Sequence, residues 1–160
     1  MKDEHVTTAT AGKYLTFALA GEEYGIPVLK AREIIKLMDI TTVPRVPAHV
    51  KGVINLRGRL VPVIDLRLKF GLKVEESTDR TCIIVVEAVA SGRSVMLGII
   101  VDQVSEVLNI TGEEIEAPPD FGEQLDTRYM LGIAKIKGKV KMLLDLDKSL
   151  TVEVAFAEAA

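Results

Sequence analysis

The sequence is poor in the residue types on which enzymes and disulfide-rich secreted domains depend. Its 160 residues include one cysteine, two histidines and no tryptophan, and aromatic residues make up 4%. The single cysteine, Cys82, cannot form a disulfide within the chain, and no cysteine–histidine cluster has metal-ligand spacing. A G-x-S-x-G nucleophile motif is also missing. We therefore expect no enzymatic activity, no cofactor and no bound metal.

Two further absences limit the environment and the partners. No apolar run approaches the roughly 18 residues that would span a membrane, and the N-terminal MKDEHVTTATAGK lacks the apolar segment of a signal peptide. A net charge of −3 and few aromatic rings are not typical of nucleic-acid binding. We expect a cytoplasmic protein with no direct membrane insertion and no nucleic-acid partner.

What the chain does contain is short apolar runs separated by turn residues. Hydrophobic residues make up 48% of the sequence and are mainly Val, Ile and Leu, which is typical of β-structure. Turns about every ten residues favour an all-β fold of barrels or a sandwich. Residues 29–40 predict a helical turn leading into a strand, and residues 67–72 and the tail from Asp147 predict short helices. Strands are expected at 13–20, 23–28, 81–90 and 94–102 and on both sides of the Arg57-Gly58 turn.

An internal repeat divides the chain into two similar halves. Residues 51–66 match residues 131–146 at an offset of 80, with glycines and an aspartate at equivalent places. A second match, from Gly25 to Gly98, has an offset of 73. We predict a single domain over 1–160 that holds two five-stranded β-barrels related by a pseudo-two-fold axis and sharing a hydrophobic core. Its approximate halves are 13–72 and 81–146, and each half is expected to supply the strands of one barrel.

The repeat also separates scaffold from candidate function. Gly52 and Gly58 resemble the glycines of a phosphate-binding loop in their spacing. No Lys-Ser or Lys-Thr follows them, so we do not expect a phosphate loop here. Asp65 and Asp145 occupy the same place in each half, which favours helix caps over a catalytic carboxylate pair. Cys82, in an apolar strand, fits a small buried hydrophobe.

Three residues differ in character between the copies: Asn55, Arg57 and Pro62. Arg57 is open to two interpretations, a solvated hairpin flank or a planar fork that binds a carboxylate or backbone of a partner protein. Glu33 recurs as Glu106, which fits a structural ion pair. Its neighbours Val28, Ala31 and Ile34, if exposed at a sheet edge, would form an apolar groove with a charged rim, as protein interfaces do.

Three segments, 21–34, 43–71 and 98–108, resemble the CheW family of bacterial chemotaxis coupling proteins. The most specific part is the G-V-I-N-L-R-G-x-x-x-P-V-I-D-L pattern that begins at Gly52. The resemblance implies two five-stranded SH3-like barrels and a non-catalytic adaptor. Such a protein couples chemoreceptors (methyl-accepting chemotaxis proteins) to the histidine kinase CheA and helps assemble signalling arrays. The implied partners are the regulatory domain of CheA and the cytoplasmic signalling tip of the receptors, so membrane association would be indirect.

Carried over by position, the resemblance implies a receptor-binding set and assigns no individual kinase contacts. The receptor-binding set is Val28, Ala31, Glu33, Arg57, Val104 and Val107. Ala31 departs from the larger aliphatic residue that is usual in the family, which would make the groove shallower. Two alternatives stay open: a coupling protein of a non-flagellar system, with pili or a second messenger as output, and a nucleic-acid-binding barrel. The latter would use Arg57, Arg59, Arg67 and Lys69.

Overall fold

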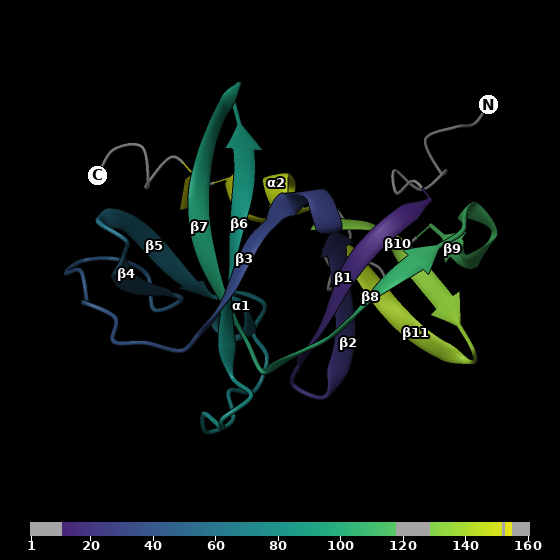
Figure 1. Cartoon of the computed structure of the whole chain (residues 1–160), viewed down its shortest axis with the longest axis horizontal. Helices are drawn as coiled ribbons and strands as arrows, with labels where there is room; N and C mark the ends of the chain where they lie inside the picture. The colour runs from purple at the N-terminus through teal and green to yellow at the C-terminus, as the bar shows by residue number, and fades with distance from the viewer. Residues whose placement is uncertain (1–10, 118–128, 152, 155–160) are drawn as a thin grey trace.

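The computed structural model describes residues 11–117, 129–151 and 153–154, and its strands form two sheets (Figure 1). Barrel 1 has the strand order β3-β6-β7-β5-β4. Its strands are β3 (Ala31–Lys36), β4 (Val50–Leu56), β5 (Arg59–Asp65), β6 (Cys82–Ala90) and β7 (Arg93–Val101). Barrel 2 has the order β8-β1-β2-β11-β10-β9. Its strands are β1 (Gly12–Leu19), β2 (Glu22–Pro27), β8 (Gln103–Ile110), β9 (Ile115–Glu116), β10 (Met130–Ile136) and β11 (Lys139–Leu144).

Short helical turns connect these strands. The 3-10 turns are η2 (Val28–Lys30) and η3 (Gly112–Glu114), and the α-helices are α1 (Leu66–Lys69) and α2 (Leu146–Ser149). The helical turn and strand predicted for residues 29–40 are present as η2 and β3. Asp65 and Asp145 cap α1 and α2 through their side chains, as the repeat predicted. No helix in the described ranges is both long and apolar enough to cross a bilayer. The leader and most of the loop that lengthens the second half lie outside the described residues.

The predicted mainly β fold with two subdomains is confirmed, but the assignment of strands to barrels is wrong. The β1–β2 hairpin of the first half belongs to barrel 2, and the β6–β7 hairpin of the second half belongs to barrel 1. Four pairings join strands from different halves: β2 with β11 and β7 with β5 are parallel, and β1 with β8 and β3 with β6 are antiparallel. Sequence similarity identified which strands are equivalent, but equivalent strands offer the same backbone hydrogen bonds and do not reveal their partners.

The repeat holds at the level of strand register. Gly25 lies opposite Leu143 in barrel 2, and Gly98 lies opposite Val63 in barrel 1. These two pairs are related by the offsets of 73 and 80 found in the sequence. The pseudo-two-fold relation therefore reaches the level of individual residue pairs.

Four hairpins are closed by the same kind of two-residue turn. Each has a residue and then a glycine with positive φ, for example 53° at Arg57 and 84° at Gly58. Such turns twist in the direction that antiparallel strands require, and glycine adopts them without steric cost. The other three turns are Ala20-Gly21, Ser91-Gly92 and Lys137-Gly138.

Gly52 allows barrel 1 to close. Its φ is 140°, and a Cβ added there would lie 1.9 Å from the carbonyl oxygen of Thr41. Thr41 exchanges two backbone hydrogen bonds with Val53, each of 2.9 Å, which join the chain beyond β3 to strand β4. Gly52 is therefore required by this close backbone approach.

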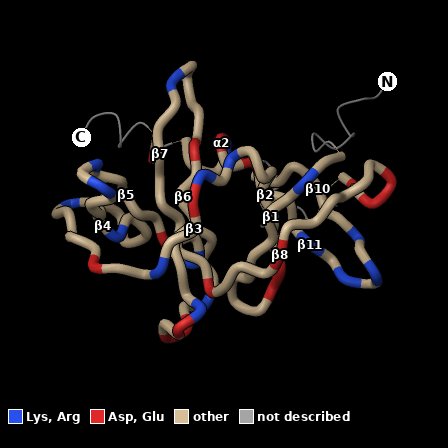
Figure 2. Tube along the Cα trace, viewed as in Figure 1, with Lys and Arg blue, Asp and Glu red and all other residues tan. Residues whose placement is uncertain are grey.

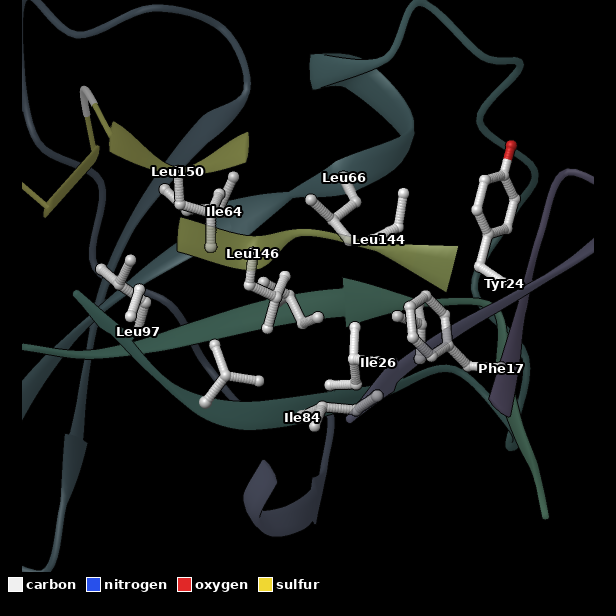
Figure 3. Packing of buried hydrophobic residues seen from close by; sticks show 14 of the residues in the cluster. Phe17, Tyr24, Ile26, Ile64, Leu66, Ile84, Leu97, Leu144, Leu146 and Leu150 are labelled. Atoms are coloured by element: carbon white, nitrogen blue, oxygen red, sulfur yellow. The ribbon is translucent and has the colours of Figure 1, made fainter. Parts of the chain in front are cut away.

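The hydrophobic core has three parts. The largest is the shared core, to which both barrels contribute, for example Ile64 and Leu66 from one side and Leu144 and Leu146 from the other (Figure 3). A second cluster fills barrel 1 around Val63, and a third fills barrel 2. Strand β5 thus buries both faces, Val63 inside its barrel and Ile64 in the shared core, as its two-sided apolar pattern predicted.

Candidate functional site

Strand β3 is at the edge of barrel 1, and a bulge determines which of its residues share a face. Ala31 pairs with Val86, whereas Glu33 pairs with the preceding residue of β6, so the register shifts between them. Such a bulge places two residues opposite one and turns the following side chains to the other face. Ala31 and Ile34 consequently face the side of the shared core, while Glu33 faces the opening of the barrel.

The structure brings Glu33 and Arg57 into direct contact. Arg57 Nη1 donates to Glu33 Oε2 at 3.0 Å, and Nη2 donates to Glu33 Oε1, so the guanidinium binds both carboxylate oxygens. Hydrogen bonds from Arg57 hold the pKa of the Glu33 carboxyl below its ordinary value, and the pKa of Arg57 is raised in turn. Arg57 still has 69% of its side chain exposed. It is therefore a held and oriented cation on the surface.

The local sequence positions Arg57 for this contact. Asn55 Oδ1 accepts a hydrogen bond of 2.8 Å from the amide of Gly58, which braces the turn that carries Arg57. The second copy has Lys135 at this place, and Lys135 forms an ion pair with Glu116 on β9 instead. Asn55 and Arg57, two of the residues that distinguish the first copy, thus act together in one turn.

The remaining candidates lie on two equivalent edges. Val28 begins η2, the turn that leads into Ala31 at the start of β3. Val104 and Val107 lie on β8, the edge strand of barrel 2. At the offset of 73, Ala31 is equivalent to Val104, and Ile34 is equivalent to Val107. Ala31 and Val104 both pack against the shared core, and Ile34 and Val107 are 49% and 52% exposed. The two edges therefore present matching apolar side chains.

A surface hollow of about 350 Å³ lies beside β8, lined by Arg80, Cys82, Gln103 and Val104. Cys82 is only partly buried there, contrary to the expected buried position. Burial raises the pKa of its thiol, and a hydrogen bond with the backbone of Val104 partly opposes this. Cys82 begins β6 and Gln103 begins β8, so the hollow lies where the starts of these two strands meet. Sequence analysis missed this hollow, since no local pattern connects residues 80 and 103.

The basic residues proposed for nucleic-acid binding are mostly engaged elsewhere. Arg67 is buried and binds Asp65 and Asp102, and Lys69 binds Glu153 at 2.7 Å. Arg57 is held by Glu33. Of the four basic residues, Arg59 is therefore the one that is exposed and has no such contact described above. Figure 2 shows that each barrel carries both positive and negative residues. This arrangement does not offer the continuous basic surface that a nucleic-acid backbone requires.

In the described ranges, no group of three or more His, Cys, Asp or Glu side chains is placed to hold a metal ion. The chemistry that the site can perform is recognition, with apolar edges beside one oriented guanidinium.

Comparison with known proteins gives consistent results. The family model described as the CheW-like domain matches residues 13–154. The chemotaxis protein CheW of Klebsiella aerogenes is 40% identical over 88% of this chain and 82% of its own length. The chemotaxis protein CheW of Bacillus subtilis is 37% identical over 90% of each chain. The crystal structure of the scaffolding protein TtCheW from Thermoanaerobacter tengcongensis superimposes with a TM-score of 0.78 and 36% identity, over 88% of this chain and 93% of that one.

Proposed function

Because this chain belongs to the CheW-like family, we propose that it is a non-catalytic adaptor that couples chemoreceptors to the histidine kinase CheA. It would bind the cytoplasmic signalling tip of the receptors on one surface and the regulatory domain of CheA on another. Its place in the cell would be the cytoplasm, at receptor arrays that reach the membrane through the receptors. The relatives are named as chemotaxis proteins, which supports chemotaxis over a pilus or second-messenger system.

The observation that carries the receptor-binding proposal is the composition of the two edges. Ala31 and Ile34 on β3 and Val104 and Val107 on β8 supply apolar contacts, with Val28 at the start of the first edge. An apolar centre beside a charged rim is the usual anatomy of a protein interface. The stripe of apolar residues on an amphipathic helix would fit such a surface.

Arg57 gives this surface its specificity. Its guanidinium is exposed but oriented by Glu33, so little conformational freedom is lost when a partner binds. A carboxylate or carbonyl group of the receptor would bind the donors that face solvent. Coupling would then follow from simultaneous binding, because a receptor displacement is passed to a kinase held on the same rigid pair of barrels. Weak individual contacts suffice in an array, since multivalency raises the effective affinity.

The proposal is tested by binding assays with a purified receptor signalling fragment and CheA, followed by measurement of CheA autophosphorylation. The wild-type protein should bind both partners and raise receptor-dependent kinase activity. Binding to neither partner would refute the proposed function.

Variants at one turn test the role of Arg57. Arg57→Glu should abolish receptor binding while circular dichroism stays that of the folded protein, and Arg59→Glu, two residues away and also exposed, should bind normally. The exchange variant Glu33→Arg/Arg57→Glu keeps an ion pair but moves the guanidinium. If the exchange variant binds the receptor weakly, receptor binding depends on the guanidinium at position 57 and not on the ion pair alone. Unchanged ternary assembly with Arg57→Glu would contradict it.

A further inference from the structure

The chain crosses from one barrel to the other at two short links. Link 1 is Asp102 alone, which joins β7 of barrel 1 to β8 of barrel 2. Link 2 is the turn η2 (Val28–Lys30), which joins β2 of barrel 2 to β3 of barrel 1. Every other connection between successive described strands stays within one barrel. Two connections still leave the barrels a rotation about the line that joins them, and short links of this kind are where hinge motions occur.

Both links lead directly into the edges proposed to bind the receptor. β3 follows link 2 and has Ala31 as its first residue, and β8 follows link 1 and has Val104 as its second residue. Figure 1 shows β3 and β8 next to the region where the two barrels meet. The spacing and angle between the two edges therefore depend on the relative orientation of the barrels. A receptor helix that contacts both edges at once binds more tightly when that orientation is already fixed.

A buried arginine clamps link 1. Arg67, on α1 beyond barrel 1, has 4% of its side chain exposed, and its Nε and Nη2 each donate to a different oxygen of Asp65 at 3.0 Å. Its Nη1 donates to Asp102 Oδ1 at 2.8 Å. The other oxygen of Asp102, Oδ2, accepts from the amide of Ala20 at 2.7 Å, and the amide of Asp102 donates to the carbonyl of Ala18 at 3.0 Å. In these contacts, which we call clamp 1, barrel 1 holds the link through Arg67 and barrel 2 holds it through the β1–β2 hairpin.

An aspartate clamps link 2 from the equivalent place. Asp147, on α2 beyond barrel 2, matches Arg67 at the offset of 80, so the sign of the clamping charge is reversed. Both of its carboxylate oxygens accept from Lys30 Nζ at 2.9 Å, and Oδ1 also accepts from the amide of Val89 at 2.8 Å. Lys30 is the last residue of link 2, and Val89 lies on β6 of barrel 1. In clamp 2 the helix beyond barrel 2 thus holds both the link and barrel 1.

The clamps supply a restraint of a kind that the shared core does not. Apolar contacts hold the barrels together with no preferred direction, whereas hydrogen bonds restrain both distance and angle. Hydrogen bonds between charged groups that use both oxygens of a carboxylate add geometric specificity. Buried ion pairs add little net stability, but breaking one leaves a charge without its partner. The clamps are therefore suited to fix an orientation.

We propose that Arg67 and Asp147 are positioning residues, which fix the orientation of the two receptor-binding edges by clamping the links in front of them. Neither residue belongs to the receptor-binding set, so each acts through a link and not by contact with the receptor. This inference rests on the proposed coupling function and adds a requirement to it, namely a fixed relation between the two edges.

A distance measurement without any receptor tests the clamps. Spin labels at Lys36→Cys and Asn109→Cys, in a Cys82→Ala background, mark exposed and equivalent positions on β3 and β8. Arg67→Met/Asp147→Ala, which opens both clamps, should widen the distribution of this inter-barrel distance by about twofold or more, because rotation about the links is then released. Labels at Lys36→Cys and Lys51→Cys, both on barrel 1, should keep the wild-type distribution.

Two control variants separate clamping from the loss of stability or of charge. Lys141→Met breaks a buried ion pair with Glu23 that lies within barrel 2, so it should lower stability without widening the inter-barrel distance. Asp147→Asn keeps Oδ1, the oxygen that accepts from both Lys30 and Val89. It should therefore preserve the narrow distribution that Asp147→Ala loses.

Affinity for the receptor signalling fragment tests the positioning role. If opening the clamps lowers the population of the binding orientation to about a tenth, the apparent affinity falls about tenfold, because only that fraction is ready to bind. Calorimetric titration should show this loss for Arg67→Met/Asp147→Ala and wild-type affinity for Lys141→Met.

Each outcome decides the proposal. A wider inter-barrel distance together with weaker receptor binding supports it. An unchanged distance, equal widening in Lys141→Met, or widening with wild-type affinity overturns it. If Arg67→Met/Asp147→Ala does not fold, Asp102→Asn/Asp147→Ala takes its place, because the change at Asp102 leaves one acceptor oxygen where Arg67 and Ala20 need two. Failure of that variant to fold as well would show that these residues serve folding and would also overturn the proposal.

The two measurements also separate this inference from the proposed function. If the wild-type protein does not bind the receptor fragment, the proposed function fails, and the role of the clamps in receptor binding fails with it. The distance measurement needs no receptor, so it would still decide whether the clamps fix the orientation of the barrels.

Discussion

The two barrels arrange their equivalent strands in the same order, with β9 added in barrel 2, but they differ where the edge strand approaches the hairpin turn. In barrel 1, Glu33 on the edge strand is bound at both carboxylate oxygens by Arg57 on the hairpin turn. The equivalent residues of barrel 2 are Glu106 and Lys137, and these two described residues form no ion pair with each other. A lysine presents one compact charge, whereas the planar arginine fork matches a carboxylate. Under the proposed function, the duplicated scaffold would carry a recognition feature in barrel 1 that barrel 2 lacks.

The largest effect is expected where barrel 1 closes. Gly52→Ala would place a Cβ against the Thr41 carbonyl at a φ of 140°, and we expect it to lower the free energy of unfolding by about 3 kcal/mol or more. Gly58→Ala is the matched control, because its φ is also positive but no atom lies within 4 Å of the added Cβ. It should cost about 1 kcal/mol from backbone strain alone.

Urea denaturation measures both values, and amide exchange at Val53 reports the loss of closure. Equal destabilisation by the two substitutions would show that the Thr41 contact is unimportant.

The second prediction compares the two apolar edges. Ala31→Val gives β3 the residue that β8 has at Val104, and adds about two buried methyl groups worth ~0.8 kcal/mol each. We expect receptor-fragment affinity to rise by up to about tenfold. Val104→Ala should lower it by a similar factor. Calorimetric titration measures the affinity of both variants for the receptor fragment. If neither variant changes the affinity, these edges are not part of the receptor-binding surface.

The third prediction concerns pH. The pKa of Glu33 is lowered in the folded protein because Arg57 donates to its carboxylate. A lowered folded-state pKa means that the stabilisation is present above the unfolded-state pKa and is lost as pH falls through the folded-state pKa. The wild-type protein should therefore be slightly more stable than Glu33→Gln near neutral pH, and the difference should vanish in acid below the ordinary glutamate range.

Thermal unfolding of both proteins across pH tests this dependence. The same pair of measurements on Glu106→Gln is the control, and a difference that persists in acid would contradict the ion-pair explanation.

The smallest effect should come from giving barrel 2 the arginine of barrel 1. Lys137→Arg would allow a fork contact with Glu106, worth a few tenths of a kcal/mol at an exposed site. Receptor binding should not change, because the bracing Asn55 is not transferred and Lys135 stays at the equivalent position. A rise in receptor affinity would show that an arginine at either turn is sufficient.

Most of the scaffold could be predicted from the sequence, because the repeat marks equivalent turns, caps and strands. The same repeat led to the wrong assignment of hairpins to barrels, since similarity between strands does not reveal which of two equivalent edges they join. The contact of Glu33 with Arg57 joins residues 24 positions apart. The sequence indicated an ion pair for Glu33 and a solvated flank or a partner contact for Arg57, but it did not pair the two residues, because their contact depends on the closure of the folded barrel. The hollow at Cys82 had no local signal at all.

The exchange of hairpins also affects how the chain is made. Glu23 and Lys141, which meet in barrel 2, are 118 residues apart in sequence. At a synthesis rate of about 5–20 residues per second, the first hairpin emerges roughly 6–24 s before the strand that it pairs with in parallel. Barrel 1 has all its strands once β7 is made, whereas barrel 2 must wait for β11. The barrel that carries Arg57 is therefore the first to have all its strands synthesised. The β1–β2 hairpin is made early but must wait for β11 before its barrel can be completed.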